Sequence, residues 1–164
     1  MSIDESRWGM PDLLTHLMVA QGCRKGASNA AVTVWFLVGT VLPDILTRPF
    51  IIVTNSSAVF WFVMPLHTPI GLLFVCAFIS FFVRPQHQKR IFYNLIGGAA
   101  LHLFLDMLQK HMGASYYLLF PFSWSSFEIG LVWPEDSLYL IPLWCAVGAV
   151  LVGRWWLRTK TSRL

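Results

Sequence analysis

His102 and Asp106 stand four residues apart in an apolar stretch, residues 91–108, that is long enough to cross a bilayer. Residues at positions i and i+4 share one face of a helix, so this imidazole and this carboxylate can reach the same point. Burying an Asp at the centre of a membrane helix costs roughly 2.5–3.5 kcal/mol, whereas an i,i+4 pair contributes only about 0.2–0.5 kcal/mol on a soluble helix. The pair therefore predicts a functional site, and its nitrogen and oxygen donors suit a divalent metal.

The chain has the composition of an integral membrane protein. Of its 164 residues, 56% are hydrophobic and only 12% are charged, and the mean hydropathy is +0.61. Four charge-poor stretches come near or exceed the roughly 17–25 residues that span hydrocarbon: residues 30–46, 50–83, 91–108 and 138–153. Together with the length, they predict a single membrane domain over residues 1–164.

Lysine and arginine predict the direction of each span. They collect at Arg24 and Lys25, around residues 84–90, and in the tail, residues 154–163. Placing all three groups on the cytoplasmic side obeys the positive-inside rule and makes the C-terminus cytoplasmic. The formal net charge of +4 therefore reports topology, and no nucleic-acid partner is expected.

With these anchors, four stretches alternate between running outward and returning: residues 30–46, 66–83, 91–109 and 138–153. Residues 50–63 then form a re-entrant or interfacial hairpin on the outer side. Residues 10–23 either lie on the cytoplasmic surface or cross as a short tilted helix, and we favour the crossing. The predicted fold is an all-α, polytopic membrane protein with about five membrane helices, this hairpin, an aromatic outer loop, and a last helix with a basic cytoplasmic tail over residues 138–164.

Topology alone brings several ionisable residues to one depth. With a helical rise of about 1.5 Å per residue, four of them fall in the outer half of the membrane: Asp44, His67, His102 and Asp106. His16 joins them if the first helix crosses. Zn²⁺ takes such nitrogen and oxygen ligands at roughly 2.0–2.2 Å, and an open position lowers the pKa of its bound water to about 7. The scattered cysteines offer no Cys-x-x-Cys site, so we expect zinc held by these residues, with manganese or iron as alternatives.

Two of these residues also have a purely structural explanation. A buried histidine such as His67 can be a hydrogen-bonded core residue, and Asp44 after Pro43 can cap a turn. In lipid, the small gain of such structural roles cannot offset the insertion cost, so we favour a functional cluster.

Five segments, in their order along the chain, resemble the successive motifs of the predicted inner-membrane metal-dependent hydrolases of the YdjM type. They are Pro-Asp-Leu-Leu-Thr-His at 11–16, Gly-Thr-Val-Leu-Pro-Asp at 39–44, His-Thr-Pro at 67–69, the segment 98–106 ending in His-Leu-Phe-Leu-Asp, and Leu-Phe-Pro-Phe-Ser at 119–123. The resemblance covers residues 10–125, and its strength lies in order and spacing, because no single motif is specific. It implies metal ligation by five residues: His16, Asp44, His67, His102 and Asp106.

The resemblance also implies a chemistry. The family is thought to be distantly similar to zinc-dependent phospholipase C and P1-type nucleases, all-helical enzymes that cut phosphoesters with clustered zinc ions. The sequence departs from the family pattern, since the order Thr-His is reversed to His67-Thr68 and no His-Arg pair precedes it in residues 62–66. We therefore expect one or two ions.

Other residues are candidates for substrate binding or proton transfer. Arg48 and Lys110 flank the predicted site on its outer side, where cations hold a phosphate, although snorkelling to lipid headgroups explains them equally well. Trp124 belongs to an aromatic outer loop, residues 111–137, which forms either a lid or substrate wall on the outer leaflet or an aromatic belt. Three carboxylates without a ligand role are candidates for a general base: Asp12, Glu135 and Asp136. For the last two, capping the last helix is the alternative.

The sequence thus favours a membrane-embedded, metal-dependent hydrolase of the phospholipase C-like type, in the cytoplasmic (inner) membrane of a bacterium or archaeon. A metal-activated water would cleave a phosphoester of a lipid or lipid-linked substrate at the outer leaflet. Two alternatives from other classes are a small metal or proton transporter, and a non-catalytic membrane interaction protein with a vestigial metal site. The sequence predicts no particular oligomeric state.

Overall fold

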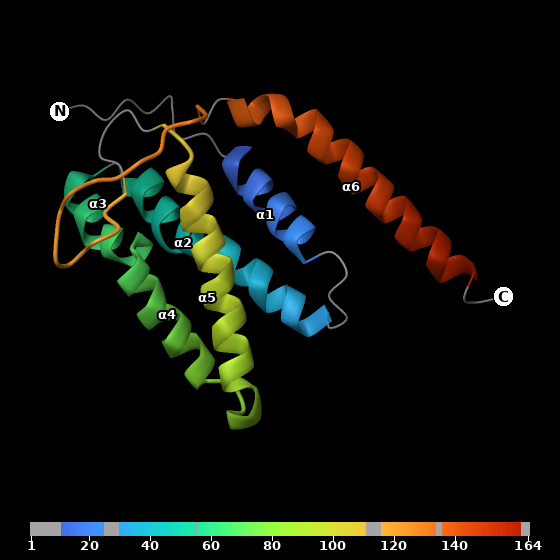
Figure 1. Cartoon of the computed structure of the whole chain (residues 1–164), viewed down its shortest axis with the longest axis horizontal. Coiled ribbons are helices and arrows are strands. Elements are labelled where there is room, and N and C mark those ends of the chain that lie inside the picture. Colours follow the sequence, from blue (N-terminus) through green and yellow to red (C-terminus); the bar gives the residue numbers. More distant parts are fainter. Residues whose placement is uncertain (1–10, 25–29, 55, 111–115, 134–135, 162–164) are drawn as a thin grey trace.

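The computed structural model describes residues 11–24, 30–54, 56–110, 116–133 and 136–161. In these ranges the chain forms six α-helices, one 3₁₀ segment and no β-strand, so the all-α prediction is confirmed. Figure 1 shows the helices α1 to α6 coloured along the chain.

The centre of the fold is the contact between α2 (Ala30–Thr54) and α5 (Pro85–Met107). Two glycines let the backbones touch, because a Cβ at Gly39 would overlap the carbonyl of Leu95, and a Cβ at Gly98 would overlap that of Phe36. Small residues at such a contact let membrane helices approach closely. The contact therefore sets how the residues further along both helices face each other.

α4 (Pro69–Phe81) lies beside α5 as its antiparallel partner, joined to it by a short turn (Figure 1). The buried apolar cluster lies among α2, α4 and α5 and consists of Leu42, Leu72, Cys76, Ile91, Leu95, Ala99 and Leu103. The cluster follows α5 from Ile91 to Leu103 and so reaches the turn of α5 that carries His102.

α3 (Ser57–Val63) and the 3₁₀ segment η2 (Met64–His67) precede α4, and the chain bends by 70° between them and α4. Thr68 caps α4, because its hydroxyl accepts a hydrogen bond from the Gly71 amide (3.2 Å). Pro69 takes the first helical position, where its missing N–H is no loss. The break places His67 directly before the bend.

α2 is longer than predicted, because it continues past residue 46 to Thr54 through Pro43 and Pro49. Membrane helices tolerate proline where side chains and neighbouring helices compensate for the interrupted backbone bonding. Two threonine hydroxyls bond back one turn here: Thr47 donates to the carbonyl of Pro43 (2.9 Å) and Thr54 to that of Phe50 (2.7 Å). Residues 50–54 therefore belong to α2, and the hairpin predicted over 50–63 begins later, with α3.

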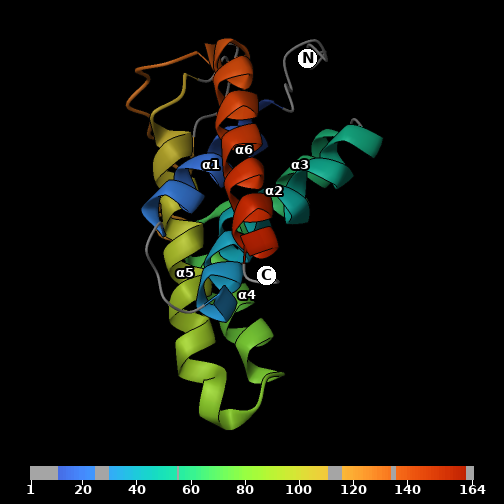
Figure 2. The same cartoon turned by 90° about the vertical axis from the view of Figure 1, so that its right-hand side faces the viewer.

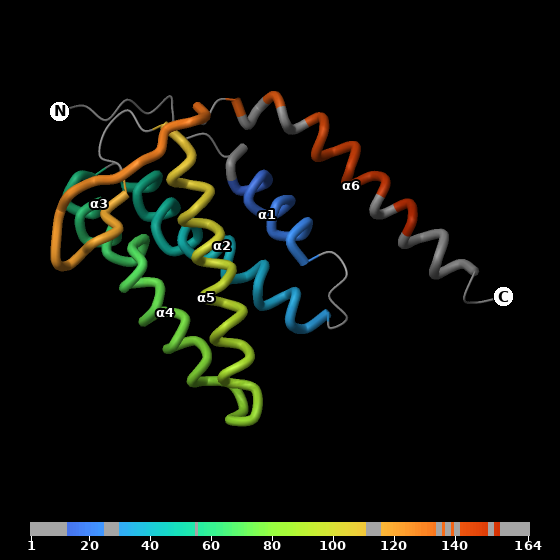
Figure 3. Tube along the Cα trace, viewed as in Figure 1, coloured from blue at the N-terminus to red at the C-terminus, as the bar shows by residue number. Residues whose placement is uncertain are grey.

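α1 (Pro11–Cys23) packs against α2 and α5 on one side and against α6 (Asp136–Thr161) on the other. The second half of α6 diverges from α4 and α5 (Figure 1), and the view turned by 90° shows α6 standing in front of α2 (Figure 2). The Cα trace makes the same arrangement visible without the ribbons (Figure 3). The first helix is thus a packed part of the helix assembly, as the crossing alternative requires.

Among the described helices, α2 is long and apolar enough to cross a membrane. The bent pair of α3–η2 and α4 would be a second span if it is counted as one, and α1 is a shorter apolar helix. Length and composition therefore support one or two spans, and about five membrane helices stays a prediction.

The aromatic loop, residues 116–133, runs over α3 and is drawn in orange in Figure 1. Its rings pack on those of α3, with centroids 5.9 Å apart for Trp61 and Tyr117 and 5.7 Å apart for Trp61 and Trp124. The loop also returns to the end of α5, where the Ile129 amide donates to the carbonyl of Met107 (2.7 Å). The aromatic loop therefore contacts both α3 and the end of α5.

Candidate metal centre

Four elements that are far apart in the sequence bring five buried ionisable side chains together. They are His16 from α1, Asp44 from α2, His67 from η2, and His102 and Asp106 from α5. Three of the five are fully buried, and the other two are at most 7% exposed. These are the five residues predicted as metal ligands.

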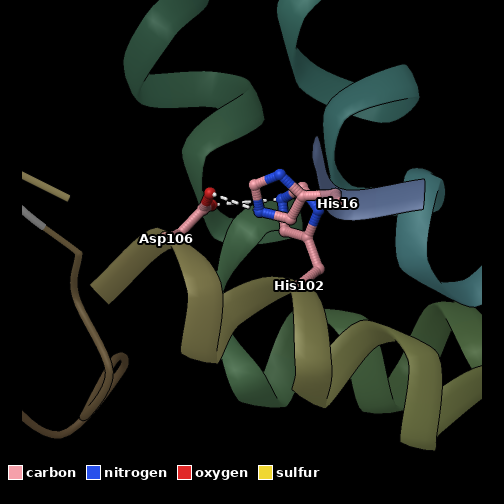
Figure 4. Close-up of side chains that lie close together, drawn as sticks. All are labelled: His16, His102 and Asp106. Atoms are coloured by element: carbon pink, nitrogen blue, oxygen red, sulfur yellow. Dashed lines mark ion pairs between the residues drawn. The ribbon is translucent and has the colours of Figure 1, made fainter. Parts of the chain in front are cut away.

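Asp106 is the centre of this His/Asp cluster. Its Oδ1 lies 3.1 Å from Nε2 of His16. Its Oδ2 lies 2.9 Å from Nε2 of His67 and 3.1 Å from Nε2 of His102. Figure 4 shows the rings of His16 and His102 next to each other with Asp106 beside them, and their centroids are 4.4 Å apart. Three imidazoles from three elements therefore converge on one carboxylate.

Asp44 forms the second side of the cluster. Its Oδ1 lies 3.5 Å from Nε2 of His102 and accepts a hydrogen bond from Nε of Arg48 (2.6 Å), one turn further along α2. Its Oδ2 is buried and has no hydrogen-bond partner among the described residues. Arg48 thus compensates part of the carboxylate charge and leaves one oxygen available.

Thr47 contacts the ring of His67 on the side away from Asp106. The Thr47 hydroxyl lies 3.3 Å from Nδ1 of His67 and donates its one hydrogen to the carbonyl of Pro43, so it can accept a hydrogen bond from Nδ1–H. On the other side of the ring, Nε2 of His67 lies 2.9 Å from Oδ2 of Asp106. A hydrogen bond from Nε2–H and a cation bound by both groups each satisfy this contact.

The donor set of the cluster fits a divalent cation. No hydrogen bond reaches either ring nitrogen of His102 in the described part of the chain, although an oxygen of Asp106 lies 3.1 Å from Nε2. Buried polar atoms without partners are rare, because each one costs about 1–3 kcal/mol. Ligands roughly 2.0–2.2 Å from a tetrahedral ion lie about 3.3–3.6 Å apart, close to the 2.9–3.5 Å separations here.

Two overlapping groups could each hold an ion: His16 with His102 and Asp106, and Asp44 with His67 and His102. In each group the ligand atoms all lie within 4.8 Å of one another. His102 belongs to both groups. The buried cluster is therefore suited to one ion or two adjacent ions, as the sequence predicts, and its donors leave the identity of the metal open.

The three predicted substrate-binding residues lie at different distances from the cluster. Arg48 adjoins it through Asp44. The ammonium group of Lys110 lies over the ring of Trp133, 4.9 Å from its centroid. Trp124 is 55% exposed and packs on other rings of the aromatic loop. Only Arg48 is in direct contact with a predicted ligand in these observations.

The predicted general bases are mostly outside what the structure describes. Glu135 lies outside the described residues. Asp12 is in the first turn of α1, but its side chain is not described. Asp136 begins α6, where its carboxylate accepts a hydrogen bond from the Trp133 amide (3.0 Å). This contact supports a capping role for Asp136 and does not bring it to the cluster.

Sequence reasoning missed two residues that touch His67. Thr47 hydrogen-bonds its ring, and the ring of Tyr116 stacks on it with centroids 5.5 Å apart. Thr47 follows Asp44 by three residues and so shares its helix face, which is a signal that the sequence contains. Nothing in the sequence pairs Tyr116 with His67, because that contact depends on how the aromatic loop folds back.

Comparison with known proteins gives one result. The family model described as "YdjM inner membrane protein" matches residues 12–163. The match extends through α6, which the motif resemblance over residues 10–125 left out. The search of curated proteins found no match, and neither did the search of solved structures. Because the family model covers nearly the whole chain, the chain belongs to the YdjM inner membrane protein family.

Proposed function

We propose that the protein is a membrane-embedded, metal-dependent hydrolase that cleaves a phosphoester of a lipid or lipid-linked substrate. The observation that carries this proposal is the convergence of three Nε2 atoms on Asp106 in a buried site. An apolar core has no structural need for five ionisable groups, since burying charges is expensive unless they are paired or coordinate a metal. When bound, an ion there supplies Lewis-acid chemistry, polarising a phosphoryl oxygen and making water a better nucleophile.

The residues around the ion have separate tasks in this proposal. Asp106 and Asp44 supply negative charge from two sides, and the three imidazoles supply neutral donors. Arg48 adjoins Asp44 at the half-buried edge of the cluster, where a guanidinium can bind a phosphate oxygen. Tyr116 lies against His67 and so covers that side of the cluster with the aromatic loop. Asp12, one helical turn before His16 on α1, is the general base that we propose first, ahead of Glu135 and Asp136.

We further propose a multi-pass topology with about five membrane helices and the site toward the outer side. The end of α1, the turn between α4 and α5, and the end of α6 all point toward the lower side of Figure 1. These are the segments with the basic residues, which the positive-inside rule places in the cytoplasm. The end of α5 that carries Asp106 and the aromatic loop lie on the opposite side, which supports an outer-leaflet substrate.

The test is the metal content and phosphoesterase activity of purified protein and two histidine variants. His102→Ala removes the residue shared by both metal groups, and His87→Ala removes an exposed histidine near the start of α5. We expect His102→Ala to lose both metal and hydrolysis of a phospholipid phosphoester, and His87→Ala to keep its metal. Metal-loaded protein that hydrolyses no phosphoester, yet carries Zn²⁺ across a liposome membrane, would overturn the hydrolase in favour of a transporter.

A further inference from the structure

A cavity of about 220 Å³ lies between the first turns of α2 and α5, at the opposite end of α5 from the His/Asp cluster. Its lining includes Trp35, His87, Arg90 and Asn94, with Ala31 and Ile91 as apolar wall. Asn94 and Asp106 are twelve positions apart on α5, which is about 18 Å along a helix. The cavity is therefore separate from the proposed metal site.

A second arginine, Arg24, adjoins this basic-end cavity through Asn94 and does not line it. The guanidinium of Arg24 donates to Oδ1 of Asn94 (3.1 Å) and lies over the ring of Phe36, 5.2 Å from its centroid. The amide of Asn94 in turn donates to the carbonyl of Arg90 (2.7 Å). Nε of Arg24 is buried and has no hydrogen-bond partner in the described part of the chain. These contacts fix the position of Arg24, and its Nε–H remains as a donor without a partner in the described part of the chain.

Basic groups predominate at this end of the described chain. Within the described residues, no carboxylate lines the cavity and neither Arg24 nor Arg90 forms an ion pair. The guanidinium of Arg90, which lines the cavity, and that of Arg24, which bonds the lining residue Asn94, attract an anion, and guanidinium geometry matches the oxygens of a phosphate. The ligand chemistry is therefore that of a phosphate group.

We propose that this cavity binds the headgroup phosphate of an anionic phospholipid. The chain belongs to an inner membrane protein family, and basic pockets between membrane helices on the cytoplasmic side bind anionic headgroups. The volume is below the roughly 300–1,000 Å³ of pockets that enclose a whole drug-sized ligand, so it suits a headgroup whose acyl chains stay in the bilayer. Trp35 adds the kind of ring that favours the headgroup level. The placement on the cytoplasmic side rests on the topology proposed above, and no step depends on the hydrolase proposal.

The experiment measures lipid binding to the delipidated full chain in detergent by native mass spectrometry. Phosphatidylglycerol is the anionic probe, phosphatidylcholine the zwitterionic one, and inorganic phosphate the soluble source of the same chemistry. Arg90→Gln removes one charge, and Ala31→Phe fills the cavity without changing charge. Lys89→Gln is the matched control, because Lys89 is an exposed basic neighbour that does not line the cavity.

We expect phosphatidylglycerol to bind better than phosphatidylcholine, and Arg90→Gln and Ala31→Phe each to weaken its binding about tenfold. Lys89→Gln leaves the affinity nearly unchanged. An equal loss in Lys89→Gln, or none in Ala31→Phe, would overturn the site in favour of diffuse surface attraction. Inorganic phosphate that displaces the lipid at equal concentration would overturn the lipid as ligand. Thermal unfolding of each variant keeps a folding defect from being mistaken for lost binding.

Discussion

The two ends of α5 differ in how deeply their charged groups are buried and in whether groups of opposite charge lie beside them. At the end with His102 and Asp106, ionisable groups of both kinds are buried and face one another within about 3.5 Å. At the end with Arg90, basic groups stay exposed or half-buried, and no carboxylate lines the cavity among the residues that the structure describes. Buried charge persists only where partners or a cation compensate it, whereas charge at an interface needs no internal partner. The first end therefore suits the metal ion and the second the external anion that we propose for them.

The largest effect is expected from Asp106→Asn, which keeps the shape of the side chain and removes its charge. Loss of a residue that only supports a ligand typically lowers metal affinity 10–100-fold, so loss of a charged ligand should lower it by more than about 100-fold. Titration of the purified protein with Zn²⁺, by calorimetry or competition with a chelating dye, measures this. The control is Asp136→Asn at the start of α6. A comparable loss of Zn²⁺ affinity in this variant would show that the affinity does not depend specifically on Asp106.

A second comparison separates the two ligand groups within the cluster. His102→Ala removes a donor from both groups, whereas His16→Ala leaves Asp44, His67 and His102 intact. We expect zinc content to fall to background in His102→Ala and only in part in His16→Ala. Equal losses in the two variants would mean that the groups form a single site. Elemental analysis per mole of folded protein gives the answer.

The close contact between α2 and α5 can be disrupted by a substitution at one glycine, Gly98. A Cβ at Gly98 would overlap the backbone carbonyl of Phe36, while one at Gly97 would make ordinary contact with the Phe36 ring at 3.4 Å. Gly98→Ala should therefore lower the free energy of unfolding by about 1–3 kcal/mol, and Gly97→Ala should not. Thermal unfolding in detergent checks both variants. Equal stability of the two would contradict the close approach of α2 and α5.

The smallest expected effect concerns the partner of His67. Residues that orient metal-binding histidines typically contribute 10–100-fold to metal affinity. A single neutral hydrogen bond belongs at the lower end of this range. We therefore expect Thr47→Val to weaken Zn²⁺ binding about tenfold. Thr47→Ser keeps the hydroxyl and should restore most of the affinity. If Ser and Val behave alike, the hydroxyl does not position His67. Zn²⁺ titration with thermal unfolding as a parallel measurement separates positioning from packing.

Much of the helical pattern was predictable because apolar stretches and breakers are local properties of the chain. The last helix begins and α5 ends close to their predicted positions, and the first helix matches residues 10–23 almost residue for residue. α5 begins at Pro85, earlier than the predicted residue 91. The end of α2 was not predictable in this way. Proline at 43 and 49 signals an ending, yet the helix continues, because neighbouring helices and threonine hydroxyls support it.

By itself, the sequence determined the family motifs, the membrane composition and the identities of the five clustered residues. Residue types, helical spacing and the distribution of lysine and arginine all follow directly from the order of residues in the chain. Only the tertiary structure decided that His16 reaches Asp106 and that Thr47 and Tyr116 contact His67. It also created the basic-end cavity between α2 and α5. The physical reason is that these contacts join elements whose relative position depends on packing, above all on the close approach at Gly39 and Gly98.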